Sequence, residues 1–498
     1  MIFSSPKFIL LFLPIAFLGY FFLNRNRLIL AGKAWLVIVS LFFYAYWNIA
    51  YLPLLLGSIL FNFAIGMMLS RNSACSTSGR LWFSSRFVLA GGIAANLALL
   101  GYFKYADFLV DNINSVFNAG LISPHILLPL GISFFTFTQI AYLVDSYRGE
   151  TGEYDFLNYA LFVTFFPHLI AGPILHHREM MSQFKSRWTL AIRYRNIALG
   201  LFIFSIGLFK KVVIADTFAI WANAGFDVAD EGSSLDFFSA WAASLSYTFQ
   251  LYFDFSGYCD MAIGAALLFN IWLPINFNSP YQALNIQDFW RRWHITLSRY
   301  LRDYLYIPLG GSRCSTPRVC FNLMATFILG GLWHGASWMF IIWGALHGIA
   351  LVAYRAWSGS GLRMPKAMAW LLTFNFINIS WVFFRASTLD DALRVIWGMM
   401  DINSVINLPL LQVPTSSLVW GGWFSDHLLR WLPVGLASNL FCFTMILLTL
   451  GIIGQKNSFE LMMGGQGAIK LSGALLLFCI AMYFTMVTTS SIFLYFNF

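Results

Sequence analysis

Long apolar runs recur along almost the whole chain, and only short polar segments separate them. Most of these runs approach the roughly 20 residues that a helix needs to cross a bilayer. Only 10% of the 498 residues are charged, 59% are hydrophobic, and the mean hydropathy is +0.71. A soluble protein of this size needs far more polar surface. The sequence therefore predicts an all-α, polytopic membrane protein.

The runs predict about eleven transmembrane helices together with re-entrant or interfacial helices. After a retained first helix at the N-terminus they lie near residues 34–50, 52–69, 87–103, 126–144, 156–172, 197–214, 237–253, 259–273, 321–333, 337–356, 367–384, 436–454 and 472–495. Three of them, 126–144, 259–273 and 321–333, carry Gly or Pro, which predicts broken or re-entrant helices. No polar segment is long enough for a separate soluble domain, so we expect one integral-membrane domain, 1–498.

The formal net charge of +9 is typical of a membrane protein with basic cytoplasmic loops. Basic clusters in 174–196 and 274–320 are expected on the cytoplasmic side, in contact with anionic membrane lipid. Nucleic-acid binding is not expected, because no soluble basic domain is present. The six cysteines form no C-x-x-C pair, so neither a disulfide framework nor a metal site is predicted.

A basic amphipathic helix is predicted over 286–306, just before an apolar stretch that carries two histidines. Its apolar face would hold Trp290, Trp293, His294, Leu297, Leu301 and Tyr304. Its polar face would hold Asp288, Arg291, Arg292, Arg299, Arg302 and Asp303. Two interpretations of these arginines stay open. They either anchor the helix in the membrane interface or bind an anionic donor, such as the phosphates of coenzyme A.

Three histidines in this region are candidates for proton transfer, because imidazole titrates near neutral pH. His334 lies in LGGLWHGASW, inside an apolar run where polar groups are costly, so a functional role is favoured. Trp333 and Trp338 are expected to wall its site. His294, on the apolar face of its helix, is equally consistent with a structural and a catalytic role. His347 is expected to form a hydrogen bond between helices, on a different face from His334.

Other polar residues in apolar surroundings are interpreted as structural. Asp254 and Asp260 lie in one such run, and a buried carboxylate near a cation is most simply an ion pair that fixes packing. No H-E-x-x-H, Walker or G-x-S-x-G motif is present.

The segments RRWHITLSRYLRDYLYIPLGG and GGLWHGASWMFIIWGALHG resemble the membrane-bound O-acyltransferase (MBOAT) family, in particular its bacterial alginate O-acetyltransferase-like branch. The segments SFFTFTQIAYLVDSYRG, FFPHLIAGPI and YFDFSGYCDMAIG are also similar to that branch. The resemblance covers about residues 1–390 and is weaker over 399–498. It implies the MBOAT fold, with His334 and His294 as the catalytic residues.

This resemblance further implies an O-acyltransferase of the bacterial inner membrane, and the chemistry of the branch implies an O-acetyltransferase. It would pass acetyl groups from a cytoplasmic thioester, acetyl-CoA as donor and no permanently bound cofactor, to an alginate-like or cellulose-like exopolysaccharide. Its partners would be periplasmic acetyltransferase or acceptor proteins of a polysaccharide export system. Two alternatives stay open: D-alanyl or peptidoglycan O-acyl transfer by the same fold, and a membrane transporter without bond chemistry.

Overall fold

The computed structural model describes residues 1–74, 84–151, 155–175, 177–405, 434–465, 467–487 and 493–494. Every regular element in these ranges is helical, as predicted. The chain divides into two compact units, Met1–Phe204 with Met261–Pro274, and Ser205–Asp260 with Ile275–Phe498. The expectation of one domain over 1–498 stays a prediction, and parts of the predicted C-terminal spans lie outside the described residues.

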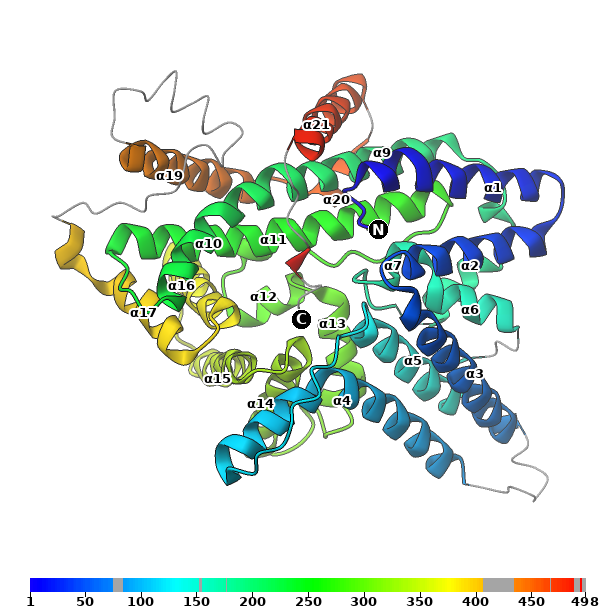
Figure 1. Cartoon of the computed structure of the whole chain (residues 1–498), viewed down its shortest axis with the longest axis horizontal. Coiled ribbons are helices and arrows are strands. Elements are labelled where there is room, and N and C mark those ends of the chain that lie inside the picture. The colour runs from blue at the N-terminus through cyan, green and yellow to red at the C-terminus, as the bar shows by residue number, and fades with distance from the viewer. Residues whose placement is uncertain are drawn as a thin grey trace. The chain divides into compact units, whose positions relative to one another are not determined.

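The first unit consists of eight helices along its described residues, drawn from blue to cyan in Figure 1. They are α1 (Leu13–Arg25), α2 (Ile29–Ala45), α3 (Leu52–Ala74), α4 (Ser85–Phe117), α5 (Ile132–Tyr147), α6 (Phe156–Thr164), α7 (Phe166–Leu169) and α8 (His177–Phe184). Helix α1 packs on α2, and α3, α4 and α5 pack on one another. Two further helices, α9 (Tyr194–Phe209) and α11 (Phe237–Leu268), begin in one unit and end in the other.

The second unit carries the stretch that the sequence singled out. Its other described helices are α10 (Asp216–Asp230), α12 (Ile286–Arg292), α13 (Ile295–Leu301), α14 (Thr316–His334), α15 (Trp338–Gly359), α16 (Lys366–Arg385), α17 (Leu389–Met400), α19 (Val434–Ile453), α20 (Ser458–Met463) and α21 (Ala468–Val487). A π-helical turn, Lys210–Ala215, joins α9 to α10, and another, Arg302–Tyr306, follows α13.

Seven helical segments in the described ranges are long and apolar enough to cross a membrane. They are Phe8–Arg25, Ile49–Ser70, Ser85–Phe117, Tyr194–Asp230, Trp338–Gly359, Lys366–Arg385 and Ala468–Val487. Two shorter apolar helices are Ile29–Ala45 and Leu440–Ile453. The chain is thus a multi-pass membrane protein, and the predicted count of about eleven spans stays a prediction.

Two of the three helices predicted to be broken are continuous, and their glycines serve close packing instead. Helix α11 runs unbroken to Leu268, and a Cβ on Gly264 would lie 2.6 Å from the carbonyl oxygen of Gly200 in α9. In α14, a Cβ on Gly331 would collide with the carbonyl of Phe340 in α15. A helix interior tolerates glycine where a neighbouring backbone needs its space. Helix α14 does end at His334, where Gly335 turns extended.

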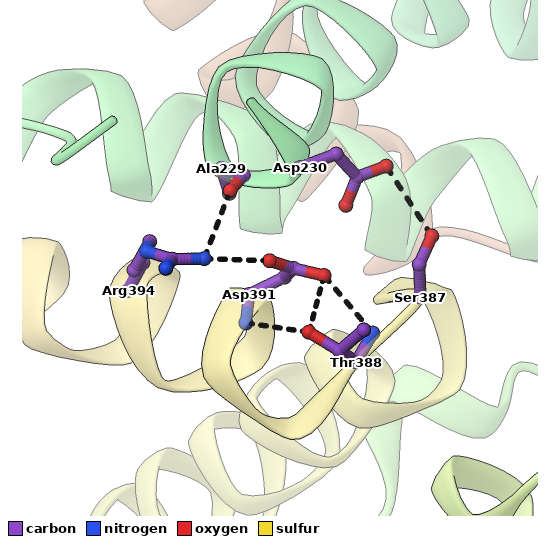
Figure 2. A network of polar contacts seen from close by, with 6 residues as sticks. All are labelled: Ala229, Asp230, Ser387, Thr388, Asp391 and Arg394. Carbon is purple, nitrogen blue, oxygen red and sulfur yellow. Dashed lines mark hydrogen bonds and ion pairs between the residues drawn. The ribbon is translucent and has the colours of Figure 1, made fainter. Parts of the chain in front are cut away.

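A capping box fixes the corner between α16 and α17 (Figure 2). The Thr388 hydroxyl accepts a hydrogen bond from the Asp391 N–H at 3.3 Å, and the Asp391 carboxylate accepts one from the Thr388 N–H at 3.0 Å. Arg394 donates to Asp391 at 2.7 Å and to the Ala229 carbonyl near the end of α10 at 3.3 Å. This corner therefore ties the end of α16, where Phe384 lies, to α10.

Candidate active site

His294 lies between two short helices, not within the single helix that was predicted over 286–306. Helix α12 ends at Arg292, and His294 has a left-handed backbone, with φ 42° and ψ 53°. The loop before α12 causes the break: the Asn278 N–H donates to the Arg292 carbonyl at 2.9 Å, and the Ile295 N–H donates to the Asn276 carbonyl at 3.0 Å. These bonds replace helical ones, so the prediction of a continuous helix is wrong.

The predicted apolar face survives this break. Trp290, Trp293, His294, Leu297 and Leu301 are all buried. The face persists because each short helix keeps its own apolar positions toward the core, although the backbone between them turns.

His334 is the last residue of α14 and is 3% exposed. Aromatic rings surround its imidazole, with centroid distances of 4.9 Å to Trp333, 5.2 Å to Trp343 and 5.2 Å to Phe384. Trp338, predicted as a second wall, is instead 58% exposed. It begins α15 directly after the turn and faces outward, so Trp343 takes its place one and a half helical turns later.

The structure brings His294 and His334 together. Their ring centroids are 6.5 Å apart, although the residues lie 40 positions apart in the sequence. Trp333 contacts both rings, at 4.9 Å from His334 and 6.3 Å from His294. Two buried imidazoles of adjacent elements thus share one aromatic chamber.

His347 joins helices, as predicted. The Trp290 indole N–H of α12 donates to His347 Nδ1 at 3.2 Å, and His347 Nε2 lies 3.1 Å from the Ser380 hydroxyl of α16. Because the indole can only donate, Nδ1 must accept, so Nε2 carries the proton and donates to Ser380. Both ring nitrogens of His347 therefore form hydrogen bonds that join helices.

The four predicted donor-binding arginines separate into two groups. Arg291, Arg299 and Arg302 line a cavity of about 510 Å³ between α12, α13 and the following π-helical turn on one side and α14 and α15 on the other. Arg292 does not line it, and instead donates to Asp288 at 2.9 Å and to the Asn278 carbonyl. No acidic side chain is among the described lining residues of the cavity. Arg302 also donates to the neighbouring Asp303 carboxylate at 2.7 and 3.1 Å. Arginine side chains in such a cavity match the geometry of a phosphate-bearing ligand.

The cavity is linked to the histidines through tryptophan rings. Trp290 lines the cavity and lies 5.9 Å from Trp343, measured between ring centroids. Trp343 in turn lies 5.2 Å from His334. Two tryptophan rings in succession, Trp290 and Trp343, therefore connect the basic cavity to His334.

Burial determines the charge state of this site. Removal from water lowers the pKa of the His294 imidazole to about 3, so it is neutral at physiological pH. At the mouth of the cavity, the hydrogen bonds with Asp303 raise the pKa of the Arg302 guanidinium. The arrangement combines a neutral proton acceptor with permanent cations, which suits the transfer of an acyl group from an anionic carrier.

Sequence reasoning missed the residues that shape the chamber from other elements. Asn276, Trp343 and Phe384 all contact a candidate histidine. The two aromatic residues lie in runs with many similar neighbours, so nothing in the sequence separates them. Asn276 offered one signal, a polar side chain in a short segment between an apolar helix and the R-W-H sequence.

Comparison with known proteins identifies the family of the chain. The profile of the membrane-bound O-acyltransferase family matches residues 17–389. A peptidoglycan O-acetyltransferase from Helicobacter pylori is 50% identical, and the match covers 100% of this chain and 98% of the relative. A probable alginate O-acetylase from Pseudomonas aeruginosa is 42% identical over 84% of this chain and 80% of the relative.

A more distant relative has a different acyl group in its name. A teichoic acid D-alanyltransferase from Bacillus subtilis is 28% identical over 59% of this chain and 76% of the relative. The family match extends over most of the chain and includes His294 and His334. The chain therefore belongs to the membrane-bound O-acyltransferase family and is an O-acyltransferase.

Proposed function

We propose that this enzyme passes acetyl groups from acetyl-CoA, on the cytoplasmic side of a bacterial inner membrane, to a glycan of the cell envelope, with peptidoglycan as that glycan. One observation carries the choice of acceptor: the 50% identity to a protein named peptidoglycan O-acetyltransferase extends along the entire chain. The sequence analysis expected an exopolysaccharide as the acceptor and kept peptidoglycan as an alternative. We now propose peptidoglycan first.

The chemistry follows from the histidine pair. His334 accepts the proton of the acceptor hydroxyl, whose oxygen then bonds to the carbonyl carbon of the acetyl thioester. The carbon–sulfur bond breaks, and the departing thiolate takes up the proton from His334. General-base catalysis of this kind contributes about 10²- to 10⁴-fold in rate. His294, 6.5 Å away between ring centroids, orients the reacting groups.

The cavity lined by Arg291, Arg299 and Arg302 supports the choice of donor. Coenzyme A carries a diphosphate and a 3′-phosphate, and arginine forks match phosphate geometry. Trp290 and Phe327 add an apolar wall on the side toward the histidines. A pantetheine arm that passes this wall would bring its thioester to His334.

The acceptor side requires a partner in this proposal. A periplasmic acetyltransferase or acceptor protein would take the acetyl group and deliver it to the glycan, as expected from the family resemblance. The aromatic chamber excludes bulk water, which protects the thioester from hydrolysis until that partner hydroxyl is present.

A second candidate acceptor is an alginate-like exopolysaccharide. The 42% identity to a probable alginate O-acetylase favours it, although that match covers 84% of this chain. D-Alanyl transfer has weaker support, from 28% identity over 59% of the chain.

The test is the acetyl content of two polymers from one strain. A deletion strain would be complemented with the wild-type chain or with His334→Ala at matched membrane levels. Ester-linked acetate would then be released by mild base from purified peptidoglycan and from secreted polysaccharide. We expect acetate to disappear from peptidoglycan alone in the variant. Loss from the secreted polysaccharide alone would establish the second candidate, and no loss from either polymer would refute acetyl transfer.

The donor is tested separately. Membrane vesicles with the cytoplasmic face outward would receive acetyl-CoA labelled in the acetyl group. Label that enters a base-labile ester with the wild-type chain, but not with His334→Ala, is the expected result. Label incorporation that is equal in both would exclude acetyl-CoA as the donor used by this site.

A further inference from the structure

Asn276 meets His294 at the centre of a compact hydrogen-bond group. Its side-chain oxygen Oδ1 lies 3.1 Å from His294 Nδ1, 3.2 Å from the Thr296 backbone nitrogen and 3.0 Å from the Thr296 hydroxyl. Its side-chain nitrogen lies 3.5 Å from the Cys259 sulfur in α11. Asn276 is 1% exposed and His294 is 0% exposed, so neither group exchanges these partners for water.

The Thr296 backbone N–H shows which atom of the Asn276 side chain is the oxygen and which His294 nitrogen carries a proton. A backbone N–H can only donate, so the Asn276 atom that faces the Thr296 nitrogen must be the carbonyl oxygen. A carbonyl oxygen can only accept, so His294 Nδ1, which lies against the same oxygen, must carry a proton. In a neutral imidazole the other nitrogen, Nε2, then holds the lone pair.

We propose that Asn276 is a positioning residue that holds His294 in the tautomer with the proton on Nδ1, so that Nε2 acts in the site as a proton acceptor. This inference rests on the proposed function only for its catalytic consequence. A neutral His294 in this tautomer cannot donate from Nε2 to a developing oxyanion. Its role is therefore to accept a hydrogen bond from the reacting hydroxyl or from His334.

The backbone supports this assignment independently. The Asn276 main-chain carbonyl accepts from the Ile295 N–H at 3.0 Å, so the same residue holds the His294 side chain and the two backbone N–H groups that follow it. The left-handed conformation of His294 is uncommon for a residue with a side chain. A conformation of this kind persists only where surrounding contacts enforce it, and such positions cluster at functional sites.

His347 provides an internal comparison in the same unit. The donor on its Nδ1 side is the Trp290 indole, so by the same logic it is held in the opposite tautomer, with the proton on Nε2. The two buried histidines thus carry their protons on different nitrogens, because one faces an obligate acceptor and the other an obligate donor.

The first experiment reads the tautomer directly. Full-length protein in detergent or lipid, labelled with ¹⁵N-histidine, would be studied by NMR, with His294 and His347 assigned from the variants His294→Gln and His347→Gln. We expect a protonated Nδ1 in His294 and a protonated Nε2 in His347. In Asn276→Ala the His294 tautomer should shift toward a protonated Nε2. A protonated Nε2 in wild-type His294, or an unchanged tautomer in Asn276→Ala, would overturn the proposal.

The second experiment reads the catalytic consequence, with Asn278→Ala as a matched control. Asn278 lies two residues along the same loop, and its side chain bonds to Asn457 instead of a histidine. We expect Asn276→Ala to lower kcat of acetyl transfer about 100-fold, at the low end for loss of a correctly held base, with KM for the donor changed less than about threefold. Asn278→Ala should keep wild-type kcat. Equal kcat in the two variants would contradict a positioning role.

The conservative variant Asn276→Asp distinguishes a positioning role of Asn276 from a role in packing alone. It also tests the proposal if Asn276→Ala does not fold. A carboxylate keeps the acceptor on His294 Nδ1, so activity should recover to within about tenfold of wild type. Its negative charge also favours the imidazolium, so the acidic limb of the pH–rate profile should move to higher pH. The titratable groups that face His294 are His334 and, behind Asn276, the Cys259 thiol.

An unshifted profile in Asn276→Asp, with activity no better than Asn276→Ala, would refute the inference. Failure of the proposed function is distinguishable from this outcome. If the wild-type chain transfers no acetyl group to any acceptor, the proposed function is wrong, while the tautomer measurement still tests Asn276 by itself.

Discussion

Two buried polar centres in the second unit differ in how their polar side chains are paired. Around the π-helical turn between α9 and α10, Lys211 lies 2.6 Å from Asp216 and 2.9 Å from Asp254. Lys210 lies 2.7 Å from Asp260, which also accepts from Ser458 at 2.6 Å. Here cations and carboxylates meet directly.

At the histidine site, by contrast, His294 faces the neutral Asn276 and His334 faces aromatic rings. A closed ion pair resists proton movement, because either partner left alone would be a buried charge. The neutral His294 imidazole, held by a neutral amide, keeps its capacity to accept a proton. The difference supports the proposal that the first centre stabilises the fold and that the second takes part in acyl transfer.

The largest effect is expected from His334→Ala. Removal of the proposed base should lower acetyl transfer about 10²- to 10⁴-fold while the variant stays in the membrane at normal levels. The measurement is the acetate ester formed per folded protein. His125→Ala, which changes an exposed histidine, is the control and should keep full activity. Normal activity in His334→Ala would show that His334 is not the base. The proposed functional difference between the two centres would then be wrong.

Lys211→Met should disrupt the cluster of ion pairs around the π-helical turn. We expect it to lower the stability of the protein and not to act directly on the acyl-transfer reaction. It leaves Asp216 and Asp254 without their shared cation, which costs about 3–5 kcal/mol for a buried pair. Thermal unfolding in detergent should show a clear drop, and Lys456→Met, at an exposed lysine, should show none. Combination with Asp216→Asn and Asp254→Asn should recover part of the loss. A variant that is fully stable yet inactive would instead assign a catalytic role to the ion centre.

Arg299→Ala and Arg292→Ala compare an arginine inside the cavity with one outside it. Loss of a charge-assisted bond to phosphate costs about 1.5–3 kcal/mol, so Arg299→Ala should raise KM for acetyl-CoA about 10- to 100-fold. Arg292→Ala removes a helix-surface pair with Asp288 and should change KM less than about threefold. Initial rates over a range of acetyl-CoA concentrations measure both. Equal effects would favour membrane anchoring as the role of all four arginines.

A further effect, on stability, is expected from pH acting on His294. Its pKa is about 3 in the folded state, below the ordinary value of 6.5 expected when unfolded. Below pH 6.5 the unfolded chain therefore binds more protons, and the free energy of unfolding should fall by up to ~1.4 kcal/mol per pH unit toward pH 3. His294→Gln removes this contribution. Parallel stability curves for wild type and variant between pH 6.5 and 4.5 would show that His294 is not buried as a neutral group.

Much of the fold was accessible from sequence because hydrophobicity is a local property. Runs such as 337–356 and 367–384 correspond closely to α15 and α16, Trp338–Gly359 and Lys366–Arg385. The hydrogen-bonding role of His347 was also correct, since a polar group in such a run must find a partner in a neighbouring helix. Glycines misled the prediction at 259–273 and 321–333, because sequence does not show whether a glycine bends a helix or lets another helix approach.

Only part of the candidate site could be predicted from the sequence. Imidazoles in apolar surroundings identified His334 and kept His294 as a candidate. The break before His294 was missed because its cause, the loop bearing Asn276 and Asn278, lies 16 to 18 positions earlier and acts through backbone hydrogen bonds. The separation of Arg292 from the other three arginines was missed because it depends on which side of each short helix faces α14 and α15.

By itself the sequence determined that this is a helical membrane protein of the O-acyltransferase family. It also determined which histidines lie in apolar segments. These properties depend on composition, periodicity and local motifs. Tertiary structure alone decided that the His294 and His334 rings lie close together, which arginines line the cavity, and which nitrogen of His294 faces Asn276. Each of these depends on contacts between segments distant in the chain, and such contacts arise only when the helices pack.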